Sequence, residues 1–391
     1  MKDFAYLSED SVYLDSACQS LRPQPVIDAL NSYYKEHNSC GERVKYDWGV
    51  ITDEKVESTR EKVLKYVKKS PRHYFVSFTL NTTYGLNLLL SQINIQAAGI
   101  KHIATSDIEH NSPFLSTISC AKKNHLPRKV ISRNLDGSLN LSDIPERALL
   151  VVNCASNIDG RLLVNIKDVV KKVHKTGGFV VIDAAQAMAH SVEILHGVEP
   201  DAICFSAHKM YAPSLGGIII SKDFAKLIDT SFIGGGMVDD VDKETYLLSK
   251  DNPEHLYTQF EAGLQAWGEI IGLGVAIDWL NSLDKKDHQL LQENAKRLFS
   301  ALSTKKKIHL VNDAPATTMS CYVDKSELGY DSHTLGAALA DSGIMARTGY
   351  FCVHYYLDHV KHFPPLIRFS LGYHTRKSDI DKLIATLENI E

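Results

Sequence analysis

Short apolar runs alternate with longer amphipathic stretches between about residues 74 and 222. The helix-like stretches include 82–93 and 165–178, and the second ends at Gly177 and Gly178, which is typical of a helix C-cap. Strands that alternate with helices predict a mostly parallel sheet with helices on both faces. The predicted strands are 74–79, 102–107, 129–134, 148–156, 179–185, 202–207 and 216–221.

The pattern changes after about residue 260. Two consecutive helices are predicted over 266–283 and 285–303. Strand-like segments at 318–324 and 367–373 flank a helical stretch, and an amphipathic helix is predicted over 377–390. The fold class is therefore α/β, with a large domain built on the mostly parallel sheet and a smaller α+β domain toward the C-terminus. We expect residues 16–262 to form the large domain, and residues 1–15 and 263–391 to form the small one.

Composition narrows the classes of function. The 391 residues are 44% hydrophobic and 23% charged, which is ordinary for a globular protein with a sizeable core. A net charge of -4 predicts no nucleic-acid partner and no attraction to an anionic membrane. The apolar windows are too short for a membrane span, and the N-terminus lacks the pattern of a secretory signal.

The cysteines and histidines narrow the location of the protein and the kinds of site that it can have. Seven cysteines without a CxxC pair indicate free thiols rather than a disulfide framework, so we expect a cytoplasmic protein. The C-terminal histidines have no cysteine or carboxylate that completes a tetrahedral set, and we predict no metal site.

Polar residues gather where the predicted strands end, which is where ligands bind in open α/β sheets. Asp183 ends one strand, and Gln186 follows it. Ser206, His208 and Lys209 follow the next strand. A structural carboxylate and a lysine that extends its ammonium to water are the simpler explanations for Asp183 and Lys209.

Two further strand ends carry candidate residues. Thr82 and Thr83 lie at the start of a predicted helix, where free N–H groups and hydroxyls suit a phosphate, although a plain threonine N-cap is the simpler explanation of this stretch taken alone. His110 follows another strand and is either a hydrogen-bonded core residue or a group that stacks on a ring. Together with an amine and a carboxylate, these residues match the needs of pyridoxal 5'-phosphate (PLP).

The sequence resembles the class V branch of fold-type I PLP-dependent enzymes, in particular the group II cysteine desulfurase and selenocysteine lyase type. The similarity extends over nearly the whole chain. It rests on the segments YLDSA, FTLNTT, IEHNSPF, CASNIDG, IDAAQAMAH, DAICFSAHKMYAPSLGGI, GGGMV, FEAGLQAWGEIIGLGVAIDWL, ARTGYFC and IRFSLGYHTRKSDIDKL.

The resemblance implies a role for each cofactor residue. Lys209 would form the Schiff base with PLP and shuttle protons, Asp183 would keep the pyridine nitrogen protonated, and Gln186 would bond the phenolic oxygen. His110 would stack on the ring and take part in catalysis. The phosphate would lie against Thr82, Thr83, Ser206 and His208.

The resemblance also implies the substrate and the reaction. Asn157 and Arg368 would hold the carboxylate of L-cysteine or an analogue. Cys352 would take the substrate sulfur as a persulfide and pass it to an acceptor protein, for example in iron–sulfur cluster assembly, while alanine leaves. A homodimer is expected, with the GGGMV segment facing the partner's site.

Several positions depart from the family pattern. Ser16 and Cys18 stand in the DSAC segment, Cys154 replaces the usual histidine before the SN pair, Leu264 replaces a threonine, and Tyr350 is one of two residues that replace a His-His pair. These departures keep two alternatives open. One is another class V reaction, such as a selenocysteine or C–S lyase, an aminotransferase or an epimerase. The other is a non-catalytic scaffold with the PLP fold.

Overall fold

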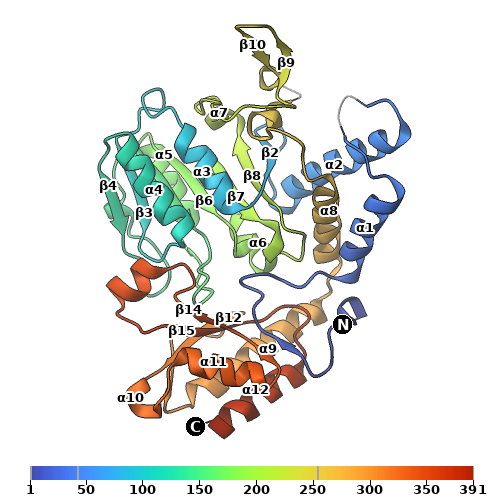
Figure 1. Ribbon diagram of the computed structural model, residues 1–391. Coiled ribbons are helices and arrows are strands. Elements are labelled where there is room, and N and C mark those ends of the chain that lie inside the picture. The colour runs from blue at the N-terminus through green and yellow to red at the C-terminus, as the bar shows by residue number, and fades with distance from the viewer. Residues whose placement is uncertain (1, 42–43, 253–254, 391) are drawn as a thin grey trace.

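A seven-stranded sheet forms the centre of the larger part of the molecule in this computed structural model, which describes residues 2–41, 44–252 and 255–390 (Figure 1). The strand order is β2-β8-β7-β6-β5-β3-β4. All pairs are parallel except those of β8, which runs antiparallel to both β2 and β7. The strands are Tyr74–Thr79 (β2), His102–Ser106 (β3), Arg128–Ile131 (β4), Ala148–Asn153 (β5), Phe179–Asp183 (β6), Ala202–Ser206 (β7) and Gly216–Ser221 (β8).

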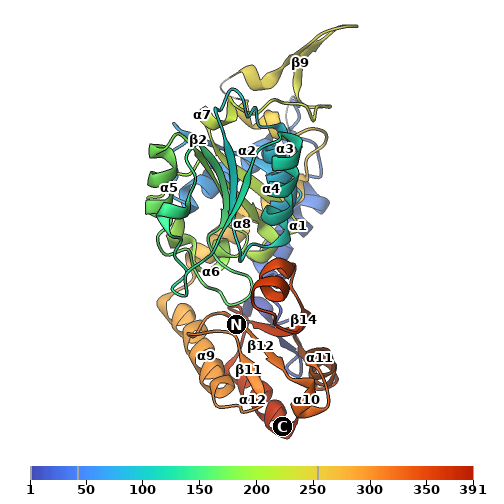
Figure 2. The ribbon, with the colours of Figure 1, turned by 90° about the vertical axis from the view of Figure 1, so that its left-hand side faces the viewer.

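Helices cover both faces of this sheet, as the apolar runs predict. Along β5, Leu149 and Val151 pack with side chains of α3 and α4, whereas Leu150 and Val152 pack with those of α5. This alternation is the two-residue period of a strand that is buried on both faces. Figure 2 shows α3 and α4 on one side of the sheet and α5 on the other. The helices are Thr82–Gln92 (α3), Asn111–Lys123 (α4), Ile166–Lys175 (α5), Ala187–His190 (α6) and Lys222–Ala225 (α7).

Three more helices pack together beside this sheet: α1 (Gln24–Glu36), α2 (Asp47–Tyr66) and α8 (Trp267–Ser282). α8 is buried on most of its surface, which fits its nearly continuous apolar sequence. It packs against both α1 and α2, so this helical layer includes residues beyond the expected boundary at 262. The domain limits stay a prediction.

A second sheet, with the order β11-β12-β15-β14, is antiparallel throughout. The N-terminal segment joins this part of the molecule, because β1 (Val12–Tyr13) pairs with β13 (Ile344–Met345) and Asp15 bridges to Ser370. Its elements are α9 (Lys285–Ser303), β11 (Ile308–Leu310), β12 (Thr318–Val323), α10 (Lys325–Leu328), α11 (Ser332–Asp341), β14 (Arg347–Gly349), β15 (Leu366–Ser370) and α12 (Lys377–Ile390).

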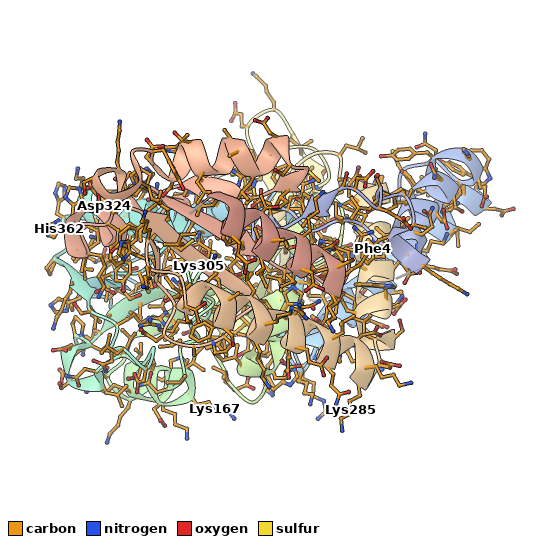
Figure 3. All side chains as sticks on the ribbon, turned by 90° about the horizontal axis from the view of Figure 1, so that it is seen from below. Phe4, Lys167, Lys285, Lys305, Asp324 and His362 are labelled. Atoms are coloured by element: carbon orange, nitrogen blue, oxygen red, sulfur yellow. The ribbon has the colours of Figure 1, made fainter. Side chains whose placement is uncertain are left out.

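A hairpin of β9 (Val238–Val241) and β10 (Tyr246–Leu248) extends away from the body of the molecule (Figures 1 and 2). Viewed from below, Lys167 and Lys285 extend at the periphery, while Phe4 lies within the N-terminal segment (Figure 3). Among the helices of the described ranges, none is long and apolar enough to cross a lipid bilayer.

Candidate active site

A cavity of about 290 Å³ lies where the carboxyl ends of the central strands meet segments of the second sheet. This is the edge at which ligands bind in open α/β folds. Every residue that the sequence singled out as a candidate lines this one cavity. These residues are Thr82, Thr83, His110, Asn157, Asp183, Gln186, Ser206, His208, Lys209, Cys352 and Arg368.

Lys209 and Asp183 carry opposite charges and both line the cavity. Asp183 is the last residue of β6, and Lys209 ends a single 3-10 turn that follows β7. Burial lowers the pKa of the Lys209 amine and raises the pKa of the Asp183 carboxyl, while each group's charge works against the other's shift. A lysine whose pKa is lowered in this way has a larger fraction of neutral, nucleophilic amine.

His110 caps the N-terminus of α4 with its ring. Its Nδ1 accepts a hydrogen bond from the Ser112 backbone N–H at 3.1 Å, which places the ring proton on Nε2. Burial, and then the nearby Lys209 and Arg368, lower the pKa of His110 to about 4. The imidazole is therefore neutral at pH 7 and presents a flat ring to the cavity.

The N-terminus of α3 forms a hydroxyl-lined cup. Asn81 caps the helix by accepting from the Tyr84 N–H at 2.9 Å. The Thr82 backbone N–H donates to Ser206 Oγ at 3.0 Å, and the two hydroxyls lie 2.7 Å apart. Gly216 allows this close approach, because a Cβ there would lie 2.4 Å from the Asn81 Cα. A helix N-terminus lined with hydroxyls suits a phosphate.

Two more predicted residues complete this end of the cavity. The Thr83 hydroxyl lies 2.6 Å from the Ser112 hydroxyl and so joins α3 to α4. His208 lies beside Lys209, and burial lowers its pKa to about 4, with smaller contributions from Lys209 and Arg22. The imidazole is thus neutral at pH 7.

The thiol of Cys352 lies on a turn that the rest of the site holds in an uncommon conformation. Phe351 and Cys352 have φ values of 47° and 60°, a region that residues other than glycine rarely adopt. The Asn111 N–H donates to the Cys352 carbonyl at 2.5 Å, and Asn157 Nδ2 donates to the Phe351 carbonyl at 2.9 Å. The Arg368 guanidinium lies 4.6 Å from the centre of the Phe351 ring. These contacts fix an exposed thiol at the cavity mouth.

Asp15 connects two arginines of the cavity. Its carboxylate accepts from Arg347 Nε at 2.9 Å and from Arg368 Nη2 at 3.2 Å. Arg368 Nη1 donates to the Asn157 carbonyl at 3.0 Å, whereas its buried Nε has no partner among the described residues. The sequence did not reveal Asp15, because its partners lie more than 300 residues away along the chain.

A buried polar network that the sequence also did not reveal lies behind the cavity. Glu109 Oε2 accepts from the Asn153 N–H at 2.8 Å, and Arg133 Nη2 lies 3.0 Å from Asn153 Oδ1 and 3.9 Å from Glu109 Oε1. Ser106 donates to Glu109 as well. Burial raises the pKa of Glu109 to about 7, although Arg133 opposes the shift. The available signal was a glutamate directly before His110, two residues after the predicted strand 102–107.

The positions that depart from the family pattern lie in different surroundings. Cys18 lines the cavity together with Cys352. Cys154 is buried beneath it, with its Sγ 3.6 Å from the Asp183 carbonyl, and burial raises the pKa of this thiol. Leu264, by contrast, is 77% exposed.

These residues fit pyridoxal 5'-phosphate. A buried carboxylate is costly without a cationic partner, and a protonated pyridine nitrogen would supply one to Asp183. Lys209 offers the amine for an imine bond, the cup at Thr82 and Ser206 offers donors for the phosphate, and the neutral ring of His110 offers a surface for stacking.

Comparison with known proteins agrees with this geometry and confirms the predicted fold class. The chain is 28% identical over 388 residues to the cysteine desulfurase of Pectobacterium atrosepticum, which covers 97% of this chain and 92% of that protein. It is 29% identical over 390 residues to a probable cysteine desulfurase of Chlamydia muridarum, with 97% and 94% covered. The apo structure of the cysteine desulfurase from Thermococcus onnurineus NA1 matches with a TM-score of 0.86 at 25% identity, over 97% of this chain and 94% of that one. Because the aminotransferase class-V family model matches residues 12–383, this chain belongs to that family.

Proposed function

We propose that this protein is a PLP-dependent cysteine desulfurase that releases alanine from L-cysteine and keeps the sulfur as a persulfide on Cys352. One observation carries the proposal: the thiol of Cys352 and the amine of Lys209 line the same cavity, although they follow strands of different sheets. The names of the relatives support this assignment.

Each cofactor residue has one task in this proposal. When bound, PLP withdraws electrons from the α carbon of the substrate amine. Lys209 takes a proton from that carbon and returns protons to the product, a task that its lowered pKa favours. Asp183 would pair with the pyridine nitrogen, Gln186 would bond the phenolic oxygen, and His110 would stack on the ring. Thr82, Thr83, Ser206 and His208 would hold the phosphate.

Arg368 and Asn157 hold the substrate carboxylate. Arg368 suits this task because its planar fork matches two carboxylate oxygens, and it is already buried beside the cavity. Asp15 keeps the guanidinium in place from the other side.

Cys352 performs the sulfur transfer. Its thiolate attacks the sulfur of the bound cysteine, the S–S bond forms, and the C–S bond breaks. The electron pair of that bond stays with the β carbon, which takes up a proton. One cysteine and one protein thiol thus give alanine and a persulfide, with no external oxidant or reductant. The exposure of Cys352 favours transfer of the sulfur to an acceptor protein, such as one that serves iron–sulfur cluster assembly.

A homodimer is part of the proposal. Apolar side chains are exposed around the Gly234–Gly236 loop and on the hairpin, where a second copy would cover them. They include Phe232, Ile233, Val241, Leu247 and Leu264. A cytoplasmic location stays a prediction that depends on the seven free cysteines.

The test is incubation of the PLP-loaded enzyme with L-cysteine, followed by quantification of alanine, sulfide and keto acid. Wild type should form alanine and sulfide in equal amounts when a thiol reductant is present. Cys352→Ala should form neither, while still binding PLP. Cys40→Ala is the matched control, because Cys40 is also an exposed thiol but does not line the cavity. Keto-acid formation, or no response to cysteine, would favour another class V reaction such as an aminotransferase or a C–S lyase, and a protein that never takes up PLP would favour a scaffold.

A further inference from the structure

A second, smaller cavity adjoins the main cavity at Lys209. Its volume is about 30 Å³, and Lys209, Gln186, Ser16 and His190 are among the residues that line it. Lys209 and Gln186 also line the main cavity, so these two residues separate the two spaces. We call this space the rear cavity.

The far end of the rear cavity adjoins a third space. His190 and Ala189 line both the rear cavity and an outer cavity of about 500 Å³, which is also lined by the exposed Lys65 and Lys68. The main, rear and outer cavities therefore adjoin one another. Lys209 lines the first two, and His190 lines the rear cavity and the outer cavity.

Buried polar atoms around the rear cavity lack protein partners. Ser16 Oγ and His190 Nδ1 are both inaccessible and have no hydrogen-bond partner among the described residues. His374 Nδ1 shares this property and lies near Ser16, since a Cβ placed on Gly372 would lie 2.8 Å from His374 Nδ1 and 2.9 Å from Ser16 Oγ. Buried polar atoms of this kind are normally satisfied by ordered water. A water needs about 10–15 Å³ of such space and at least two polar partners, and the rear cavity offers both.

His190 also contacts two tyrosines. Its Nε2 lies 3.4 Å from the Tyr211 hydroxyl, and its ring lies 5.1 Å from that of Tyr373. The Tyr373 hydroxyl in turn lies 2.9 Å from Nδ1 of His288, which is exposed at the outer cavity. His190 itself also lines the outer cavity, so its ring borders a space that the exposed Lys65 and Lys68 share.

We propose that ordered water in the rear cavity connects the Lys209 amine to His190, and that His190 relays protons between this water and solvent. The inference builds on the proposed function, in which Lys209 takes a proton from the substrate. The excess proton leaves the Lys209 ammonium for the water, the water gives a proton to His190 Nδ1, and Nε2 releases its proton outward. The imidazole begins and ends neutral, and one proton passes from Lys209 to solvent. Burial lowers the pKa of His190 to about 4, which fits a neutral ring that acts through its two nitrogens.

The first test is a crystal structure of the PLP-loaded enzyme at a resolution that shows ordered water. We expect water within hydrogen-bond distance of both Ser16 Oγ and His190 Nδ1, and its loss in His190→Phe. Phenylalanine keeps the ring packing against Tyr211 and Tyr373 but removes both nitrogens. A dry rear cavity in the wild type would overturn the proposal. Because the position of the water is observed without turnover, this test can succeed or fail whether or not the protein desulfurates cysteine.

The second test measures where the proton on Lys209 goes. Cysteine deuterated at its α carbon is turned over in ordinary water, and mass spectrometry gives the fraction of alanine that keeps deuterium there. We expect retention at least threefold above wild type in His190→Phe and in Ser16→Ala. His196→Phe is the matched control, because His196 lines the outer cavity but not the rear one, and it should match wild type. Equal retention in all four proteins would overturn the relay.

If the protein releases no sulfur from cysteine, the same relay is measured by exchange of the α proton of L-alanine into D₂O, followed by NMR. Slower exchange in His190→Phe than in His196→Phe would then support the relay while the proposed function fails. Equal exchange in both variants would overturn it.

Discussion

Two ion pairs on α2 have the same nitrogen–oxygen separation and differ in burial, so they isolate the effect of solvent. Arg60 Nη1 lies 2.6 Å from Glu261 Oε1, and the two side chains are 6% and 2% exposed. Lys62 Nζ also lies 2.6 Å from Asp278 Oδ2, but these side chains are 34% and 56% exposed. Replacing each acid by its amide keeps the shape and removes the charge.

Glu261→Gln should be strongly destabilising. Its carboxylate accepts from Arg60 Nη1 at 2.6 Å, from Arg60 Nη2 at 2.7 Å and from the Phe78 backbone N–H at 2.6 Å. The amide would leave the buried guanidinium with only the exposed Glu57 carboxylate, 3.7 Å from Arg60 Nε, as a counter-charge, and losing the buried partner costs about 3–5 kcal/mol of the free energy of unfolding. Asp278→Asn should cost at most about 1 kcal/mol, because water already screens that pair.

The assay is urea unfolding followed by tryptophan fluorescence and by circular dichroism, for wild type and both variants, at 0.15 M and 1 M NaCl. The effect of Asp278→Asn should shrink in high salt, whereas that of Glu261→Gln should not, because salt screens exposed charges far more than buried ones. If Glu261→Gln lies within about 1 kcal/mol of wild type, or if the two variants lose equal stability, the reasoning from burial is wrong.

Four further predictions follow from the site. Arg368→Lys should raise the KM for cysteine about 10- to 100-fold in steady-state assays, because one bidentate charged contact is lost. Gly216→Ala should weaken PLP binding in an absorbance titration, since its Cβ would displace Asn81 and the phosphate cup. The free energy of unfolding should rise with pH between about 4 and 6.5, because the unfolded chain binds more protons there than the folded one. The groups responsible are four histidines whose pKa burial lowers to about 4: the partly buried His110, His190 and His208 and the buried His374. Glu109 has the opposite effect, because burial raises its pKa to about 7. This shift removes about 3 kcal/mol of stability as the pH rises from about 4.5 to 7. Glu109→Gln should therefore make the urea unfolding midpoint rise more steeply with pH.

The strands and helices were largely predictable, because their apolar periods are local. The helix predicted at 285–303 and the strand predicted at 74–79 have the same bounds in the structure. The strand predicted at 129–134 ends earlier, at Ile131, because its partner β3 ends at Ser106, opposite Ile131, and Arg133 then bridges to Leu139 instead. The antiparallel direction of β8 had no local signal, since a strand buried on both faces reads the same in either direction.

The candidate site was predictable for the residues that follow strands, and its supporting residues were not. Lys209, Asp183 and the other candidates share a cavity because parallel strands end at one edge of the sheet. Asp15 and Arg133 depend on partners that only the folded chain brings near. Their charges gave no spacing or motif from which those partners could be inferred.

The N-terminal segment 15–20 joins the two sheets at the site. On the side of the second sheet, the Asp15 carboxylate binds Arg368, and the Ala17 N–H donates to Ser370 Oγ at 2.9 Å. Both partners lie on β15, so the segment follows any movement of the strand that carries the proposed carboxylate-binding arginine.

The same segment also holds the residues around the reactive amine. Gln186 Nε2 donates to the Ala17 carbonyl at 2.8 Å, and the Ser20 N–H donates to the His208 carbonyl at 3.0 Å. The segment therefore links the strand that carries Arg368 to the residues around Lys209, in addition to the direct contact of Arg368 with the Asn157 carbonyl. Cys18 departs from the family pattern within this segment and lines the cavity, so it is a position where substrate preference can change without loss of the cofactor residues.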